Sequence, residues 1–255
     1  MQDLVAIVVS HNSSEDAIRC VRSLASTSVS LKRILIIDSG SVAKHAHRLE
    51  TAAFSSGIVP GIIKTTNDGY AAAVNIGVRE LQLEDETPLL ICNADTVFQP
   101  GSADALANAV RSKQVDLVGP LLLTGARGSS RVWSRGGRLH PLLGYTSMAG
   151  RGSGLAGGQK HLRQVSFLSG AVWSCRVSIF QTLGPLREDL FMYFEDAEFL
   201  LRARANNVRA HCLTSAVVWH KVGGSSDGGK KSLLFFTFMQ RNRLLVFGEN
   251  SISRR

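Results

Sequence analysis

Several features that would assign a protein to a particular class are missing from this sequence. No stretch reaches the roughly 18 to 20 uninterrupted apolar residues that a membrane-spanning helix needs. Met1-Gln2-Asp3 leads straight into a short apolar run, without the basic segment and cleavage site of a signal peptide. The four cysteines are far apart and form no C-x-x-C pair, so the sequence does not indicate zinc or redox chemistry. We therefore expect a cytoplasmic protein with reduced core thiols.

Common nucleotide-binding and nucleic-acid-binding motifs are missing as well. The first predicted strand is followed by Ser10-His11-Asn12 rather than by G-x-G-x-x-G, and there is no P-loop. The formal net charge is +9, but the basic residues form no Lys/Arg block and do not alternate with aromatic residues. We therefore expect no nucleic-acid partner, whereas phosphorylated substrates and anionic lipid remain open.

The first 120 residues show a regular alternation of strand and helix patterns. Continuous aliphatic runs, typical of strands buried on both faces, alternate with segments whose apolar residues follow helical spacing. Strands are predicted at residues 4–9, 34–37, 61–64, 89–92 and 115–118, and helices at 14–26, 70–83 and 102–112. This alternation implies right-handed crossovers and an α/β fold with a doubly wound, mostly parallel sheet.

The second half of the chain has a different composition. Residues 124–160 are rich in glycine and poorly periodic, so we expect a long flexible loop there. Beyond it, strands are predicted at 165–173, 208–212 and 216–220, and helices at 176–183, 195–206 and 231–247. No internal repeat is evident. We expect a single domain over residues 1–255, with one half to about residue 120 and a second half from about residue 121.

Polar residues follow the predicted strands at the ends where doubly wound sheets bind ligands. One of them, Asp95, ends a buried strand on a tight turn, from which a carboxylate can bind a divalent cation together with substrate phosphates. The alternative is that Asp95 caps the helix that begins near Pro100, but it lies too far upstream for that. Asn67-Asp68-Gly69 before a helix fits either turn chemistry or a phosphate at the helix N-terminus.

Two further groups could carry chemistry. Glu195 and Asp196 begin a predicted helix, where the helix dipole alone explains acidic residues. The alternative is that one of them is a general base, because the bulky residues before them would desolvate a carboxylate and raise its basicity. His220 ends a strand next to Trp219, where a packed, hydrogen-bonded histidine is the default and a metal ligand is the alternative.

Seven segments share their order and spacing with a known family. They are "AIVVSHNSSEDAIRCVRSL", "ILIIDSGS", "TTNDGYAAAVNIGV", "LLICNADTVFQPG", "FLSGAVWSCRVSIFQTLGPLREDLFMYFEDAEFLLRAR", "VVWHKVGGSS" and "FMQRNRLLVF". Together they resemble the family 2 glycosyltransferases, inverting enzymes of the GT-A fold, and most closely the bacterial rhamnosyltransferase-like branch. Each segment is weakly specific alone, whereas the ordered set covers nearly the whole chain.

The resemblance implies a role for each matching residue. The donor-binding set is Ser10, Asn12, Asp38, Asn67, Gly69, Asn75, Asn93 and Asp95. Asp95 and His220 would hold a divalent metal, Mn2+ or Mg2+. Asp196 would be the general base, with Trp173 and Glu195 on the acceptor side. The family's D-x-D motif begins here with Asn93, which leaves the cation one anionic ligand fewer and makes its affinity depend on the nucleotide.

The resemblance also implies an activity. It predicts a metal-dependent inverting glycosyltransferase of bacterial surface polysaccharide synthesis, such as O-antigen or cell-wall glycan. The donor would be a dTDP- or UDP-sugar, with rhamnose from dTDP-rhamnose expected, and the acceptor a glycan or a polyprenol-linked sugar. The alternatives are a nucleotidyltransferase and a catalytically silent binding module of a polysaccharide assembly complex.

The last predicted helix is densely apolar and then carries Arg241 and Arg243. One interpretation is an interfacial helix near a lipid-linked acceptor, which would place the protein peripherally on the inner membrane. The other is a core helix packed on the sheet. A further alternative is that Arg241 or Arg243 instead reaches the donor phosphates.

Overall fold

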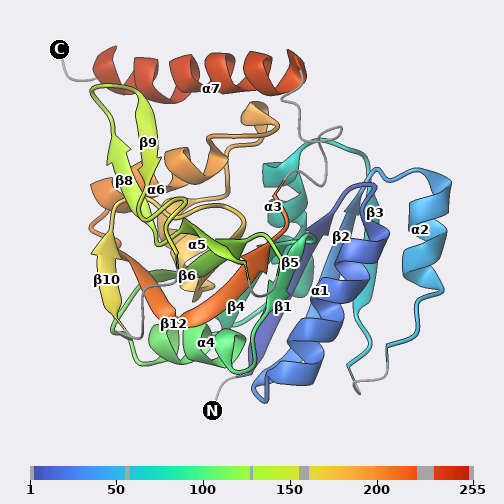
Figure 1. The fold of residues 1–255 in the computed structure, drawn as a ribbon. Coiled ribbons are helices and arrows are strands. Elements are labelled where there is room, and N and C mark those ends of the chain that lie inside the picture. The colour runs from blue at the N-terminus through green and yellow to red at the C-terminus, as the bar shows by residue number, and fades with distance from the viewer. Residues whose placement is uncertain (1–2, 55–57, 127–128, 155–160, 223–232, 253–255) are drawn as a thin grey trace.

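A ten-stranded sheet forms the centre of the protein (Figure 1). The computed structural model describes residues 3–54, 58–126, 129–154, 161–222 and 233–252. The main path through the sheet has the order β10-β12-β6-β11-β4-β1-β2-β3, while β5 pairs with β12 and β7 pairs with β6. A separate two-stranded sheet is formed by β8 and β9.

The first half has the predicted doubly wound architecture. Its parallel strands are β1 (Leu4–Ser10), β2 (Leu31–Ser39), β3 (Gly61–Thr65) and β4 (Pro88–Asn93). The helices are α1 (Ser14–Thr27), α2 (Ala43–Glu50), α3 (Tyr70–Leu81) and α4 (Ser102–Arg111). The side chains of α1 and α4 pack in one hydrophobic cluster and those of α3 in another. Both faces of the sheet are therefore covered, which explains the continuous aliphatic strands.

The second half of the sheet is mixed. β6 (Leu117–Thr124) runs parallel to β12 (Ala210–His220), and β11 (Val172–Arg176) lies antiparallel between β4 and β6. β10 (Leu162–Val165) pairs with β12 at the edge. The helical segments here are α5 (Ser178–Leu183), the 3-10 turn η1 (Glu188–Leu190) and α6 (Glu195–Ala205). Because β11 pairs on both sides, the sheet is continuous across the boundary near residue 120.

The predicted loop at 124–160 is wrong for much of its length. It contains β7 (Arg131–Ser134), which pairs with β6, and the hairpin of β8 (Gly137–His140) and β9 (Tyr145–Met148). Glycine here permits close pairing, because a Cβ on Gly137 would lie 1.9 Å from the carbonyl oxygen of Ser147. The remaining parts at 127–128 and 155–160 lie outside the described residues.

Other elements also differ from the predictions. α2 was not predicted, because it is short and mostly exposed, with Leu49 its only buried residue in the described structure. β5 (Thr96–Phe98), three residues long, was missed as well. The predicted strand at 165–173 is instead divided between β10 and β11. The two strands predicted at 208–212 and 216–220 are one strand, β12, with an irregularity between Leu213 and Val217.

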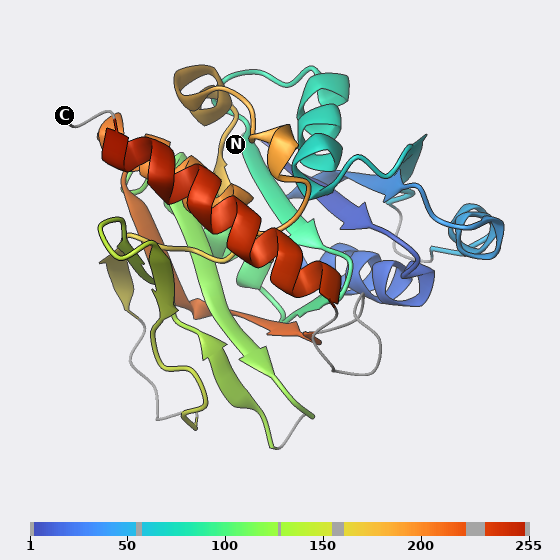
Figure 2. The ribbon, with the colours of Figure 1, turned by 90° about the horizontal axis from the view of Figure 1, so that it is seen from above.

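The last helix, α7 (Leu233–Ile252), lies across the tips of the β8–β9 hairpin and the segment before α6 (Figure 2). Phe238 stacks on Phe191 and Phe247 packs edge-on against Phe194. Its other side exposes large apolar side chains, namely Leu233, Leu234, Phe236 and Leu244. Among the described helices, none has the length and apolar character needed to cross a bilayer.

Candidate active site

The carboxyl ends of β1, β2 and β4 bring together polar residues that are distant in the sequence. Ser10 lies opposite Asp38 in the register of β1 and β2, and the two residues are only 1% and 2% exposed. Asn67 approaches the turn after β2 so closely that a Cβ on Gly40 would lie 2.7 Å from its main-chain nitrogen. The side-chain oxygen of Asn12 accepts a hydrogen bond from the main chain of Val42 at 2.8 Å, which fixes the neighbouring turn.

Two buried oxygens at this edge lack a hydrogen-bond partner among the described residues. They are Oδ1 of Asp38, near the end of β2, and Oδ1 of Asn93, at the end of β4. Leaving a buried polar atom unpaired costs about 1–3 kcal/mol. Native proteins keep few such atoms, and a bound ligand is one way to satisfy them. This edge of the sheet therefore has the chemistry of a ligand-binding surface.

Asp95 and His220 lie side by side, as the metal-site prediction required. The two residues meet because Thr96, which follows Asp95, pairs with His220 in the antiparallel register of β5 and β12. Nε2 of His220 is 3.2 Å from Oδ1 of Asp95. The main-chain nitrogen of Lys221 donates to the main-chain oxygen of Asp95 at 3.0 Å, which holds the turn in place.

The separation of these two atoms suits a divalent cation. Ligands in neighbouring positions of an octahedral site with bonds of about 2.0–2.1 Å lie ~3 Å apart. The described residues contain no cluster of three or more His, Cys, Asp or Glu side chains that could hold a metal by themselves. A cation held by Asp95 and His220 would therefore take its other ligands from a bound substrate and from water.

Asp196 is anchored to the segment that precedes β11. Its Oδ2 accepts a hydrogen bond from the main-chain nitrogen of Gly170 at 2.9 Å, and its Oδ1 accepts one from Ala197 at 2.7 Å. Gly170 packs closely against Asp196, since a Cβ on this glycine would be in van der Waals contact with the Cβ of Asp196 at 3.4 Å. Ala171, the next residue, accepts a hydrogen bond from Asn93 at 2.9 Å. Two residues therefore connect Asp196 to the strand end that leads to Asp95.

Tyr70 is a site residue that sequence analysis missed. Its hydroxyl donates to the carbonyl of Gly170 at 2.7 Å, and its main-chain nitrogen donates to the carbonyl of Phe191 at 2.9 Å. Burial raises the pKa of Tyr70 well above its usual value, and the nearby charges of Glu195, Cys92, Asp196 and Asp95 raise it further. Both carboxylates of the proposed chemistry, at positions 95 and 196, thus lie near one tyrosine. The signal in the sequence was its position immediately after Asn67-Asp68-Gly69.

The two carboxyl groups that begin α6 are both buried, but their pKa values differ. Burial raises the pKa of Glu195 to about 8, with a further increase from the charge of Asp196. Burial also raises the pKa of Asp196, to about 6, but the N–H groups of Gly170 and Ala197 stabilise its ionised form. The hydrogen bonds to Asp196 therefore favour its ionised form, whereas burial and the neighbouring charge favour the protonated form of Glu195. Two neighbouring carboxyl groups in different protonation states are typical of acid–base sites.

The segment before α6 has an unusual backbone. Phe191, Tyr193 and Phe194 have φ values of 62°, 68° and 69°, in the left-handed region that bulky residues rarely occupy. Such conformations cost about 1–3 kcal/mol each and persist only where the surroundings impose them. Gly69 packs directly against this segment, since a Cβ there would lie 2.1 Å from the carbonyl oxygen of Phe191.

Asn242 on α7 holds this segment, a role that sequence analysis did not assign. The residue is fully buried, and its Nδ2 group donates to the carbonyls of Leu190, Met192 and Tyr193 at 2.7, 2.8 and 2.9 Å. A side-chain amide that contacts three carbonyls within four residues of irregular backbone holds that backbone in place. Through this contact, α7 determines where the first turn of α6 places Glu195.

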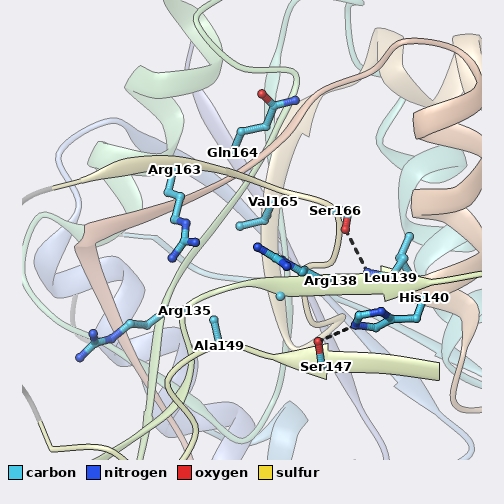
Figure 3. Close-up of a pocket in the computed structure, with 11 residues that line it drawn as sticks. Arg135, Arg138, Leu139, His140, Ser147, Ala149, Arg163, Gln164, Val165 and Ser166 are labelled. Carbon is cyan, nitrogen blue, oxygen red and sulfur yellow. Dashed lines mark hydrogen bonds between the residues drawn. The ribbon is translucent and has the colours of Figure 1, made fainter.

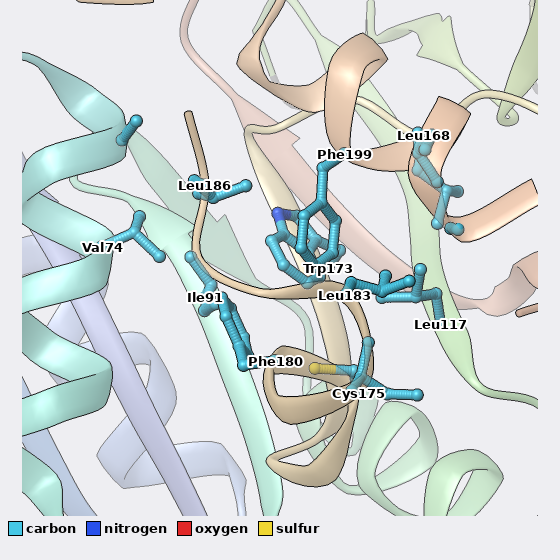
Figure 4. Packing of buried hydrophobic residues seen from close by; sticks show 14 of the residues in the cluster. Val74, Ile91, Leu117, Leu168, Trp173, Cys175, Phe180, Leu183, Leu186 and Phe199 are labelled. Carbon is cyan, nitrogen blue, oxygen red and sulfur yellow. The ribbon is translucent and has the colours of Figure 1, made fainter. Parts of the chain in front are cut away.

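Two of the predicted ligand-binding residues have structural partners. Both ends of the Asn75 amide are engaged, since Nδ2 donates to the Leu186 carbonyl and to Glu188 at 2.8 Å each and Oδ1 accepts from Leu186 at 2.9 Å. Trp173 is only 6% exposed and packs against Phe199 in the core, with 5.4 Å between the ring centroids (Figure 4). The ligand contacts predicted for Asn75 and Trp173 stay predictions.

The two arginines of α7 also bind the protein's own backbone. Arg241 donates to the carbonyl of Asp189 at 3.0 Å, and Arg243 donates to the carbonyl of Leu143 at 3.1 Å. Arg241 therefore helps to fix the 3-10 turn before α6, and Arg243 joins α7 to the β8–β9 hairpin. The contact of these arginines with donor phosphates stays a prediction.

Comparisons with known proteins agree with this architecture. The chain is 24% identical over 211 residues to the "Low-salt glycan biosynthesis hexosyltransferase Agl10" of Haloferax volcanii, a match that covers 82% of this chain and 64% of that protein. The structure resembles GalNAc-T7 with UDP, GalNAc and Mn2+ (TM-score 0.71, 15% identity, 96% of this chain and 48% of that one). It also resembles residues 1–349 of S. aureus TarS, with a TM-score of 0.58 and 16% identity, over 86% of this chain and 60% of that one.

The structural likenesses confirm the predicted GT-A type of α/β fold. The chain spans less than two thirds of the length of the curated relative that it matches. The family description "Glycosyl transferase family 2" matches residues 5–184, a span that includes β1 to α5 and contains Asp38, Asp95 and Gly170. Asp196 and His220, which complete the candidate site, lie beyond the matched residues. The chain belongs to glycosyl transferase family 2.

Proposed function

We propose that this protein is an inverting glycosyltransferase that transfers a hexose from a nucleotide sugar to a glycan acceptor. The observation that carries the proposal is the set of contacts that connects Asp196 to the strand end before Asp95. Gly170 donates a hydrogen bond to Asp196 and the neighbouring Ala171 accepts one from Asn93, at 2.9 Å each, while Asp95 lies 3.2 Å from His220 in a geometry suited to a cation. Family membership supports the reaction type, and the name of the Haloferax relative supports a hexose and glycan biosynthesis.

The donor would bind at the carboxyl ends of β1, β2 and β4. The unpaired oxygens of Asp38 and Asn93 would accept hydrogen bonds from the ribose and the sugar hydroxyls. Asp95 and His220 would hold a divalent cation together with the diphosphate, and such a cation supplies positive charge that stabilises the departing nucleoside diphosphate. The resemblance to a structure with UDP and Mn2+ supports this arrangement.

Asp196, rather than Glu195, would take the proton from the acceptor hydroxyl. A general base needs a stabilised ionised form, and the N–H groups of Gly170 and Ala197 lower the pKa of Asp196 against the effect of burial. Burial and the charge of Asp196 instead raise the pKa of Glu195. Gly170 and Ala197 orient the carboxylate while leaving each oxygen a second lone pair. Glu195, protonated and with an unpaired Oε2 among the described residues, would donate a hydrogen bond to the acceptor.

For the finer specificity we propose a dTDP- or UDP-hexose donor, with dTDP-rhamnose as the first donor to test. The acceptor would be a glycan, free or linked to a polyprenol, of a bacterial surface polysaccharide. The exposed apolar side of α7, with Leu233, Leu234, Phe236 and Leu244, would let the protein associate peripherally with the cytoplasmic face of the inner membrane. Co-sedimentation with vesicles of phosphatidylcholine, with and without phosphatidylglycerol, measures that association.

A thermal-shift screen of nucleotide sugars, with and without Mn2+, tests the proposal. Ligands that bind only the folded state raise its melting temperature, so the true donor should stabilise the protein, and more so with Mn2+. Asp95→Ala should remove the Mn2+-dependent part of the shift, whereas the exposed control Glu84→Ala should retain it. Absence of any shift with every nucleotide sugar would contradict the proposal. Release of inorganic diphosphate from a nucleoside triphosphate and a sugar 1-phosphate, in a separate assay, would indicate a nucleotidyltransferase.

A further inference from the structure

A cavity of about 640 Å³ lies away from the candidate active site, between the β8–β9 hairpin and β10. Figure 3 shows the guanidinium groups of Arg138, from β8, and Arg163, from β10, turned into the same space, with Arg135 at its edge. Ser147, Ser166 and His140 also line the cavity. The hydroxyl of Ser166 accepts a hydrogen bond from the main-chain nitrogen of Leu139 at 3.0 Å, and the hydroxyl of Ser147 lies 3.1 Å from Nε2 of His140 (Figure 3). None of the described lining residues carries a carboxylate, so two strong cations share this space without a counter-charge.

The distribution of charge in the sequence reinforces this observation. The 71 residues from 117 to 187 contain nine Lys and Arg and no Asp or Glu, which equals the whole net charge of +9. The basic residues are scattered along this segment, as sequence analysis noted, but the acidic residues that would balance them are absent. Two of the nine, Arg176 and Arg187, pair with acidic residues just outside the segment. The cavity therefore lies in a region of uncompensated positive charge, which concentrates anions.

The cavity is close enough to the proposed base to contact the same substrate. Ser166, on the cavity wall, is four residues before Gly170, whose N–H binds Asp196. Four residues of fully extended chain span at most about 14 Å. An acceptor that extends over a few sugar units could thus place one end at Asp196 and the other at Arg138 and Arg163.

We propose that this cavity binds a phosphate or diphosphate group carried by the acceptor substrate. Planar guanidinium groups match phosphate oxygens in paired hydrogen bonds, and serine hydroxyls complete such a site. That the phosphate belongs to an acceptor substrate rests on the proposed transferase function. Anion binding by the cavity does not depend on that function. The phosphate could belong to a lipid-linked acceptor or to a phosphate group within a glycan, and the two sources share the same recognition chemistry.

Calorimetric titration of the full chain, in EDTA, with inorganic diphosphate and with farnesyl diphosphate tests this site. EDTA removes the divalent cations that would direct diphosphate to Asp95. The test variant is Arg138→Gln with Arg163→Gln, and the matched control is Lys32→Gln with Arg79→Gln, two exposed cations outside the cavity. Because each charge-assisted hydrogen bond contributes about 1.5–3 kcal/mol, we expect binding to weaken at least about tenfold in the test variant and to persist in the control.

The outcomes separate the inference from the proposed function. Equal affinity of the test and control variants for both probes would overturn the inference. Tighter binding of farnesyl diphosphate than of inorganic diphosphate would identify a lipid-linked source, and equal binding would favour a phosphate within the glycan. Donor hydrolysis without acceptor reports on the transferase independently, so its absence alongside retained diphosphate binding would contradict only the proposed function. If the double variant unfolds, as judged by its melting temperature, Arg163→Gln alone gives the same comparison against Arg79→Gln.

Discussion

Replacement of Asn242 tests whether the last helix controls the geometry of the catalytic turn. Asn242→Ala removes two N–H groups that serve three carbonyls, those of Leu190, Met192 and Tyr193, in a fully buried position. A buried group that loses its partner costs about 1–3 kcal/mol, so two lost donors should reduce the free energy of unfolding by roughly 2–6 kcal/mol. Without the amide, the residues with left-handed backbone conformation should move to more favourable φ values, because each left-handed conformation costs about 1–3 kcal/mol.

The expected functional effect follows from the position of this segment before α6. A shift of about 1 Å in a catalytic group can reduce turnover by about 100-fold, and we expect a loss of that order in kcat with a smaller change in KM for the donor. Urea denaturation and steady-state kinetics measure the two effects. Asn108→Ala, at an exposed position of α4, is the control and should leave both unchanged. Wild-type stability and kcat in Asn242→Ala would refute the assignment of a positioning role.

Three further predictions concern titration and packing. The transfer rate should rise with pH as Asp196 ionises, with a midpoint at about 6, and a rate that is flat between pH 5 and 7 would contradict this. The free energy of unfolding should fall as the pH rises from about 4 to about 6, because the folded state retains this proton to a higher pH than the unfolded chain, and no fall in that range would contradict the assignment. Gly69→Ala should lower the melting temperature and the transfer rate, because its Cβ would lie 2.1 Å from the carbonyl oxygen of Phe191, while Gly154→Ala, with nothing within 4 Å, should do neither. Arg176→Met should reduce the free energy of unfolding, measured by urea denaturation, by roughly 2–4 kcal/mol. The reason is that Arg176 is only 9% exposed and its guanidinium donates to two buried carbonyls, so a loss below about 0.5 kcal/mol would show that these bonds contribute little.

The fold was largely predictable where burial determines the local pattern. Strands such as β1 and β4 are covered on both faces, so their aliphatic runs appear directly in the sequence. The β8–β9 hairpin was not predictable, because its two four-residue strands pair with each other, carry few core residues and lie in a glycine-rich part of the sequence. Propensity indicates a loop there, and only the close pairing that Gly137 permits makes a strand.

The candidate site was predictable only in part. Asp95 and Asp196 follow recognisable local patterns, and their proximity was a prediction that required the fold. Tyr70 and Asn242 act through contacts with main-chain groups that are distant in the sequence, and hydrogen bonds of this kind leave no periodic signal. The burial that separates the pKa values of Glu195 and Asp196 likewise depends on packing that forms only in the folded chain.

The most direct measurement is the transfer rate and donor affinity of Asp196→Asn, compared with the wild-type protein on the donor that the thermal-shift screen identifies. The amide keeps the shape of the carboxylate but cannot accept a proton, so transfer should fall by at least about 100-fold, within the range that general-base catalysis contributes, while the donor's dissociation constant changes little. Near-normal transfer by Asp196→Asn would show that the proton of the acceptor goes elsewhere, and the account of this site would be wrong.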